Sequence, residues 1–497
     1  MRVNDCLNNT SDLLEKIRKD KARPKYHFCA PYDLGFPFDP NAPFFHNGIY
    51  HLFYIYESRK DSYRWAHSIS KDLLHWTHLN DALIPDEDDG GIYSGGVYLD
   101  GDTAYIIYWA LGCGDKPDGI RIARSSDKYF TNFEKIKGQI VTNKSNGIAD
   151  VLDENGKTVE IGSADPSNIW KCNDKYYMVL GNLCLLNKYR ESKEIELGDH
   201  GYLFESDDLI NWKYLHEFYD RLKDNSYTDE SEDFMCPFFG KIPNSEKYIL
   251  LFLAHNRGTQ YYIGDYDTIN QKFIIESHGR MSFVDNSLFA PEAMYTPDGR
   301  LVSFYWQRDN QDDDLDRELE KGWSGIHSIP RELFLHKNGL LGIKPLEELK
   351  SLRNSIYLDK SINDDLIFTK KDFDTDCCEI ILKNLNKTTG VSINLGNEGV
   401  VNIYLDFDKK ELVYDLTNSN SKGRKVKDFA PVDLSFDDNY LQIFIDKCSI
   451  EVFASNHQAI TRQVFDTNPG NREISFIGND FSNVLVDIYE ICPTNAY

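Results

Sequence analysis

Three short segments of the chain place acidic side chains just before an apolar run. They contain Asp39 followed by Pro40, Asp165 followed by Pro166, and the acidic stretch 230–237. Each segment alone is explained as a turn, because Asp-Pro pairs commonly begin turns. Together they fit glycoside hydrolysis, which needs a carboxylate nucleophile and a carboxylic acid that donates a proton and later removes one from water. A third carboxylate can bind sugar hydroxyls more strongly in the transition state.

The charge of the chain restricts its partners. Among 497 residues, 80 are acidic and 55 are basic, which gives a net charge of −25 at pH 7. Such a surface repels phosphate backbones and anionic lipids, so we expect neither nucleic acid nor a membrane as a partner. A small carbohydrate fits better, since aromatic residues form 13% of the chain and stack on sugar rings. A homo-oligomer is compatible with the sequence, which leaves the oligomeric state open.

Motifs for metals and cofactors are missing from the sequence. The 13 His show no HxxxH or HxH spacing, and the ten Cys form no CxxC pair, so reduced thiols and no metal site are expected. The acidic stretch 309–320 lacks calcium-loop spacing and is interpreted as a solvated insertion. No phosphate loop and no Gly-x-Ser-x-Gly elbow is present, so we expect no cofactor.

Targeting signals are also missing. No stretch approaches the roughly 20 apolar residues of a membrane span. Residues 1–24 are polar and lack the apolar core of a secretory signal, which predicts a cytoplasmic protein.

The elements that must position the acidic segments are short aromatic strands. Runs bounded by Gly, Asn, Asp or Pro occur at residues 48–56, 103–109, 176–181, 247–254 and 301–306. Long amphipathic helical patterns are nearly absent, so the sequence predicts an all-β protein. A strand-turn unit recurs at residues 70–76 and 206–212, with a degenerate copy at 126–133. Recurrence at such intervals indicates a propeller over residues 25–345.

The pattern changes after Pro345. Residues 346–355 form a connector, and strict apolar-polar alternation follows at 401–406, 440–446 and 449–454. Residues 356–497 are therefore predicted to form a β-sandwich.

The ordered motifs of the chain resemble glycoside hydrolase family 32, the invertase, levanase and inulinase group. The resemblance runs from about Pro24 to the C-terminus and rests on residues 38–41, 50–54, 65–68, 71–76, 93–96, 164–166, 289–292, 322–325, 330–333 and 449–454. It implies a five-bladed propeller followed by a β-sandwich, and retaining hydrolysis of β-fructofuranosides. Asp39 would be the nucleophile and Asp165 the transition-state stabiliser.

The same resemblance implies the residues that bind the sugar. Trp65 would form an apolar wall, and Tyr93 and Ser94 would contact the fructosyl unit. Further candidate binding residues are Asn41, Arg257, Glu292 and Trp306. Arg257 could instead belong to a surface turn, and Trp306 could be part of the core.

Several positions depart from the family pattern. Phe38, Ile55 and Ala164 replace a polar Asn, a Gln and an Arg that normally bind the sugar. Most seriously, Met235 stands where the family has the acid/base Glu, and a methionine cannot donate a proton.

Three interpretations of Met235 compete. Glu232 could supply the acid/base from a reshaped turn, and we take it as the third catalytic candidate. Glu230 or Glu292 could serve instead. Alternatively, catalysis is lost and the protein only binds carbohydrate. A furanosidase for another sugar, such as an arabinoside, is the second enzymatic hypothesis, because three sugar-contacting side chains are replaced.

Overall fold

The described structure is built almost entirely from β-strands. The computed structural model describes residues 15, 19–29, 35–58, 62–183, 198–220, 227–229, 231–308, 323, 325–363, 365–419, 424–435, 438–464 and 470–495. Short 3-10 turns at Glu347–Leu352 (η1) and Gly396–Glu398 (η2) interrupt the strands. The all-β prediction is confirmed, and each of the five aromatic runs coincides with a strand. Residues 309–320, the predicted insertion, and Glu230 lie outside the described residues.

Among the described residues, the first part of the chain forms five sheets of four or five strands. The first contains β1 (Gly35–His46), β2 (Ile49–Ser58), β3 (Tyr63–Ser70) and β4 (Trp76–His78). The second contains β5 (Gly91–Asp100), β6 (Thr103–Leu111), β7 (Gly119–Ser125), β8 (Glu134–Lys135) and β9 (Val141–Thr142). A hairpin of β10 (Ile148–Leu152) and β11 (Thr158–Gly162) follows.

Three more sheets complete this part. The third contains β12 (Ala164–Pro166), β13 (Trp170–Cys172), β14 (Lys175–Gly181), β15 (Tyr202–Ser206) and β16 (Trp212–Glu217). The fourth contains β17 (Met235–Lys241), β18 (Tyr248–Ala254), β19 (Gly258–Asp267) and β20 (Lys272–Arg280). The fifth contains β21 (Leu288–Tyr295), β22 (Leu301–Gln307), β23 (Ile326–His327), β24 (Arg331–Leu335) and β25 (Leu341–Pro345).

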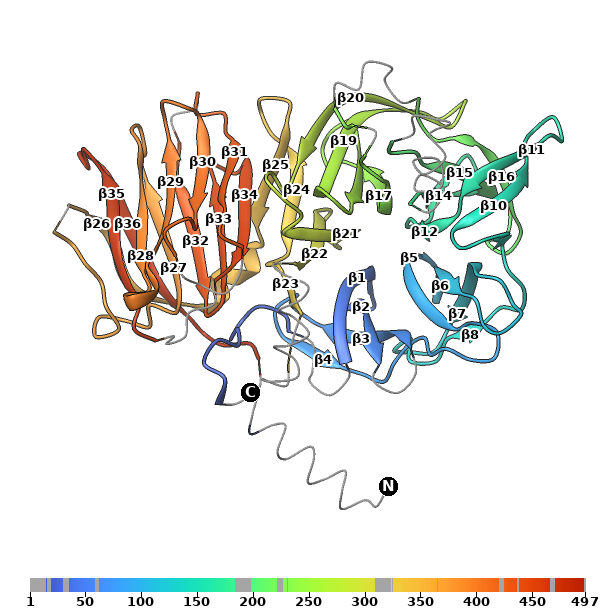
Figure 1. Cartoon of the computed structure of the whole chain (residues 1–497), viewed down its shortest axis with the longest axis horizontal. Helices are drawn as coiled ribbons and strands as arrows, with labels where there is room; N and C mark the ends of the chain where they lie inside the picture. The colour runs from blue at the N-terminus through green and yellow to red at the C-terminus, as the bar shows by residue number, and fades with distance from the viewer. Residues whose placement is uncertain are drawn as a thin grey trace.

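The first strands of the five sheets lie side by side in a closed cycle. β1 contacts β5, β5 contacts β12, β12 contacts β17, β17 contacts β21, and β21 returns to β1. Figure 1 shows these strands around a common centre, with the remaining strands of each sheet further out. Side chains at the start of the inner strands from different sheets therefore meet.

The rest of the chain forms two further sheets. The first contains β26 (Arg353–Ser361), β27 (Cys377–Lys383), β32 (Leu441–Asp446), β33 (Ser449–Ala454), β34 (Gln458–Gln463) and β36 (Leu485–Ile491). The second contains β28 (Thr389–Asn394), β29 (Val400–Asp406), β30 (Glu411–Asp415), β31 (Lys427–Pro431) and β35 (Glu473–Gly478). Alternating apolar residues of both sheets, among them Ile380, Val391 and Ile403, share one buried core.

The recurring sequence unit forms the same turn each time. In the turn from β3 to β4, the Asp72 carboxylate accepts the backbone N–H groups of Leu74 and His75. Asp208 accepts the corresponding bonds from Ile210 and Asn211 between β15 and β16. Asp127 repeats the pattern between β7 and β8, where it accepts several backbone N–H groups. The repeat thus marks the turn between the third and fourth strands, counted along the hydrogen-bonded order of each sheet.

Buried ion pairs join the N-terminal segment to the C-terminal sheets. The His27 imidazole contacts Asp446 through Nδ1 at 2.8 Å and Glu451 through Nε2 at 3.0 Å. Arg331 contacts the other oxygen of Glu451 at 3.2 Å, and all four side chains are fully buried. Burial alone would lower the pKa of His27, but its bonds to the two carboxylates outweigh burial and raise the pKa to about 9. The imidazole is therefore a buried cation at neutral pH.

Within the described part of the chain, no helix has the length and hydrophobicity needed to cross a membrane.

Candidate active site

The five inner strands carry the site residues at points where strand pairing is irregular. The register breaks between Pro37 and Pro40 in β1, Ile92 and Gly95 in β5, Ala164 and Pro166 in β12, Met235 and Phe238 in β17, and Phe289 and Glu292 in β21. Asp39, Ser94, Asp165 and Cys236 all lie within these breaks. Bulges redirect side chains and are common beside active sites. In four of the five sheets this local irregularity therefore turns one side chain of the inner strand toward a shared point.

Proline explains most of these breaks. Four of the five inner strands have a proline within the break or at its edge: Pro40, Pro166, Pro237 and Pro291. A proline has no N–H to donate to the ladder and is confined to sheet edges and bulges. Cys236 and Ala290 also have positive φ angles of 46° and 48°, which L-residues rarely adopt. Such strain collects at functional sites, where the surrounding structure maintains it.

The redirected side chains form one polar cluster. Ser94 Oγ donates to Asp39 Oδ2 at 2.9 Å. The Cys236 thiol lies 3.4 Å from Asp165 Oδ2, 3.8 Å from Ser94 Oγ and 3.9 Å from Asp39 Oδ2. Asp165 and Cys236 are buried, whereas Asp39 is partly exposed. The structure thus brings together three predicted site residues and adds Cys236, a residue that was not predicted.

Asn41 connects two of these strands. Its amide donates to the Asp39 carbonyl at 2.9 Å, and its side-chain oxygen accepts the Gly95 N–H at 2.9 Å. The side chain is fully buried. Sequence reasoning proposed Asn41 as a sugar ligand, but its hydrogen bonds fix the backbone of Asp39 beside the strand that carries Ser94.

The carboxyl groups of the cluster share an excess of negative charge. Burial, together with the nearby charge of Asp39, raises the pKa of Asp165 to about 7. Burial also raises the pKa of Asp39, although the Ser94 hydrogen bond and the charges of His255 and Arg308 oppose the rise. Because like charges in a buried site disfavour joint ionisation, the two carboxyls titrate as a coupled pair. Burial and mutual repulsion therefore both disfavour the state in which the two carboxyls are charged at once.

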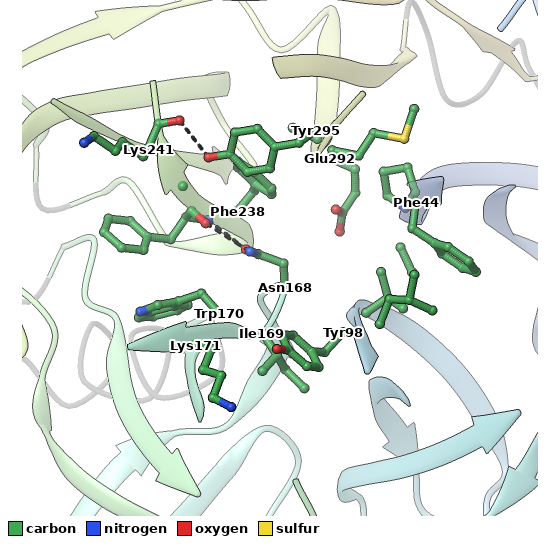
Figure 2. Close-up of a pocket in the computed structure, with 18 of the residues that line it drawn as sticks. Phe44, Tyr98, Asn168, Ile169, Trp170, Lys171, Phe238, Lys241, Glu292 and Tyr295 are labelled. Atoms are coloured by element: carbon green, nitrogen blue, oxygen red, sulfur yellow. Dashed lines mark hydrogen bonds between the residues drawn. The ribbon is translucent and has the colours of Figure 1, made fainter. Parts of the chain in front are cut away.

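Glu292 belongs to a neighbouring cavity. A space of about 390 Å³ is lined by residues further along the same inner strands, and Figure 2 shows the Glu292 carboxyl pointing into it. Burial and the charges of Asp39 and Asp165 hold the pKa of Glu292 well above its usual range, which favours the protonated carboxyl. Two of the lining residues follow cluster residues by three positions: Ala42 follows Asp39 on β1, and Asn168 follows Asp165 just beyond the end of β12.

Glu232 is held by a buried ion pair. Arg280 binds its two carboxylate oxygens at 3.0 and 2.7 Å, and Gln260 donates a third bond. The side chain is 1% exposed. A proton donor to a substrate would have to leave these partners, so the role proposed for Glu232 stays a prediction that its surroundings do not favour.

The two predicted tryptophans are buried. Trp65 has no exposed surface, and its indole N–H donates to the Tyr93 carbonyl at 3.0 Å. A direct stack on a sugar would therefore require neighbouring side chains to move. Trp306 is 2% exposed and packs edge-on against Phe38 and Phe289, with ring centroids 5.4 and 5.5 Å apart.

The remaining predicted binding residues differ in exposure. Tyr93 is partly buried between Tyr63 and Trp109. Arg257 is 45% exposed and its nearest carboxylate, on Asp229, lies 3.8 Å away. Arg257 therefore occupies an open turn, in which a ligand can reach it.

Sequence reasoning missed the pair of His255 and Asp233. His255 Nδ1 lies 2.5 Å from Asp233 Oδ2, and the His255 N–H donates to Asp233 Oδ1 at 2.7 Å. Each residue lies two positions beyond the pair of Met235 and Leu253, on opposite strands of one hairpin. The sequence does contain a signal for this pair. An Asp lies two positions before Met235, which replaces the acid/base, and a His directly follows the next aromatic strand.

Comparison with known proteins agrees with these motifs. The model of the Glycosyl hydrolases family 32 N-terminal domain matches residues 27–345, and that of the Glycosyl hydrolases family 32 C terminal matches residues 348–490. The chain belongs to glycosyl hydrolase family 32. It is therefore a glycosidase, as the sequence predicted.

Similar proteins extend over nearly the whole chain. A probable sucrose-6-phosphate hydrolase of Psychromonas ingrahamii is 27% identical over 92% of this chain and 79% of its own length. The sucrose-6-phosphate hydrolase of Bacillus subtilis is 24% identical, and the match covers 95% of its length and 95% of this chain. Among solved structures, a family 32 beta-fructofuranosidase of Bombyx mori superposes with a TM-score of 0.76 at 22% identity, covering 99% of both chains.

Proposed function

We propose that this family 32 enzyme hydrolyses β-fructofuranosides with retention at the anomeric carbon. The observation that carries the proposal is the meeting of Asp39, Ser94 and Asp165 from three different sheets. The names of the similar sucrose-6-phosphate hydrolases and of the beta-fructofuranosidase support a small fructoside as the substrate.

The two aspartates have different roles in this mechanism. Asp39 is partly exposed, so one oxygen can attack the anomeric carbon while Ser94 holds the other oxygen at 2.9 Å. A covalent fructosyl-enzyme forms, and water then releases the sugar. Asp165, buried beside Asp39, binds sugar hydroxyls and stabilises the positive charge that develops on the ring.

We also propose the finer architecture that positions these groups. The five sheets whose inner strands form a closed cycle are the blades of a five-bladed propeller over residues 25–345. Residues 356–497 form a β-sandwich, supported by the core that its two sheets share. The cytoplasmic location stays a prediction.

Product analysis tests the function. Purified protein is incubated with sucrose, sucrose 6-phosphate, short inulin- and levan-type oligosaccharides and arabinofuranosides, with Asp39→Asn as the control. We expect fructose release that the substitution abolishes, and NMR should show β-fructofuranose as the first product. Release of arabinose alone would favour the other furanosidase. Binding without any turnover would favour a carbohydrate-binding protein and contradict the proposal.

A further inference from the structure

The proposed reaction needs a proton donor that the usual position does not provide. Met235 stands there, 2% exposed within an apolar cluster, and its thioether has no proton to give. Glu232, three residues earlier, is bound to Arg280. The inference below rests on the proposed function and concerns which group supplies this proton.

The His255 and Asp233 pair lies at the same end of the same hairpin as Met235. Met235 opens β17 and pairs with Leu253 near the end of β18. Asp233 and His255 continue these two strands by two positions each, and their hydrogen bonds join the strand ends. Because Asp233 occupies Nδ1 of the imidazole, Nε2 is the nitrogen left to face a substrate.

The His255 imidazole is accessible, and the charges of the cluster act on it. The His255 side chain is 43% exposed, whereas Asp233 behind it is 3% exposed. The charges of both Asp39 and Asp165 act on His255, and its ring lies 5.6 Å from that of Phe289 on β21. By comparison, Glu232 and Glu292 are 1% and 3% exposed. Of these three groups, His255 alone combines substantial exposure with an interaction with the charges of Asp39 and Asp165.

We propose that His255 is the general acid and base of this enzyme, and that Asp233 is the positioning residue that holds its ring. The pair replaces the carboxylic acid lost at Met235. In other enzymes, too, a buried carboxylate maintains the orientation and the charge of a catalytic histidine.

The two half-reactions balance through one proton. In the first, Asp39 forms a bond to the anomeric carbon, the bond to the leaving oxygen breaks, and Nε2–H gives its proton to that oxygen. In the second, the neutral imidazole accepts a proton from water, whose oxygen bonds to the anomeric carbon as the ester to Asp39 breaks. The carboxylate and the imidazolium are both restored.

The charge state of His255 suits the first step. Burial lowers the pKa of the imidazole, but the hydrogen bond to Asp233 and the charges of Asp233, Asp165 and Asp39 together raise it above its usual value. These carboxylates therefore favour the protonated imidazole that the first step needs. General acid-base catalysis is most efficient when such a pKa lies near the working pH.

The leaving group provides the test. His255→Ala is compared with wild type on sucrose, whose alkoxide needs a proton, and on β-fructofuranosyl fluoride, whose fluoride leaves without one. We expect kcat/KM on sucrose to fall by about 10²–10⁴. The fall on the fluoride should be far smaller, azide should yield fructosyl azide, and the basic limb of the pH profile on sucrose should disappear. Asp233→Asn should lower activity on sucrose and shift that limb to lower pH.

Two variants separate competing explanations. His75→Ala removes another His-Asp pair, bonded at 2.8 Å in an exposed turn, and should leave both substrates unaffected. Glu232→Gln should not discriminate between the two substrates. Sucrose turnover by His255→Ala close to wild type, or a leaving-group effect in Glu232→Gln instead, would overturn the assignment. If wild type cleaved neither substrate, the proposed function itself would fail together with this inference.

Discussion

Two groups of carboxyls in this protein have opposite electrostatics. In the active-site cluster and at the cavity beside it, burial raises the pKa values of Asp39, Asp165 and Glu292. Glu451, at the contact between the N-terminal segment and the C-terminal sheets, is buried as deeply, yet its pKa is lowered. Burial acts on Glu451 in the same direction, but the bond to His27 and the charge of Arg331 outweigh it.

The difference lies in the supply of cations, not in burial. Glu451 contacts a buried imidazolium and a buried guanidinium, so its charge is matched. Among the described residues, no ion pair joins Asp39 or Asp165 to a cation, and only more distant charges act on them. An unmatched site is unfavourable at rest but complements the positive charge that a sugar ring acquires in the transition state.

The largest effect on stability is expected when a cation is removed from beside Glu451. Arg331→Met should destabilise the protein by about 3–5 kcal/mol, because it leaves buried Glu451 short of a partner. The free energy of unfolding in urea measures the loss. Arg124→Met, which removes an exposed pair with Glu134, serves as the control and should cost about 0–1 kcal/mol. Equal losses in both variants would contradict the argument.

A change of pH is expected to have an intermediate effect on stability. The folded pKa of His27, about 9, is raised above its ordinary 6.5, so its contribution to stability is fully present below pH 6.5 and is lost as pH rises through 9. The stability difference between wild type and His27→Gln should therefore shrink by about 2–3 kcal/mol between pH 6 and pH 10. Urea unfolding at several pH values measures it, and a difference independent of pH would refute the buried cation.

The smallest effect is expected for Glu292, on the active-site side of the comparison. The raised pKa of Glu292 favours its uncharged form, which the amide of Glu292→Gln resembles, so this substitution should change the free energy of unfolding by less than about 1 kcal/mol. For the same reason the acid limb of kcat/KM, set by the coupled Asp39 and Asp165, should not move. A shift of that limb to lower pH would mean that Glu292 carries a charge.

Much of the site could be predicted because its residues lie in contiguous sequence motifs. Aromatic strand patterns identified the sheets, and Asp39 and Asp165 stood out because proline follows each. The same dipeptides cause the strand breaks that redirect the side chains. Here the local sequence carries both the chemistry and the geometry.

What could not be predicted depends on contacts between distant segments. The ion pair of Glu232 with Arg280 spans 48 residues, and the pairing of Asp233 with His255 depends on strand register. Trp65 was expected to be a sugar wall, yet its burial depends on neighbouring strands that no single motif specifies. Asn41 was expected to bind substrate, and only the meeting of β1 and β5 reveals its bond to Gly95.

The bond between His27 and Asp446 has a consequence for the order of synthesis and folding. The two residues are separated by 419 positions, so their contact must await almost the entire chain. Contacts so distant in sequence form late because much chain must be ordered before they can close. Domains, in contrast, can fold while synthesis continues. A nascent chain that ends between Glu292 and Asp446 thus holds every residue of the catalytic cluster, but neither carboxylate that binds the His27 of its own N-terminal segment.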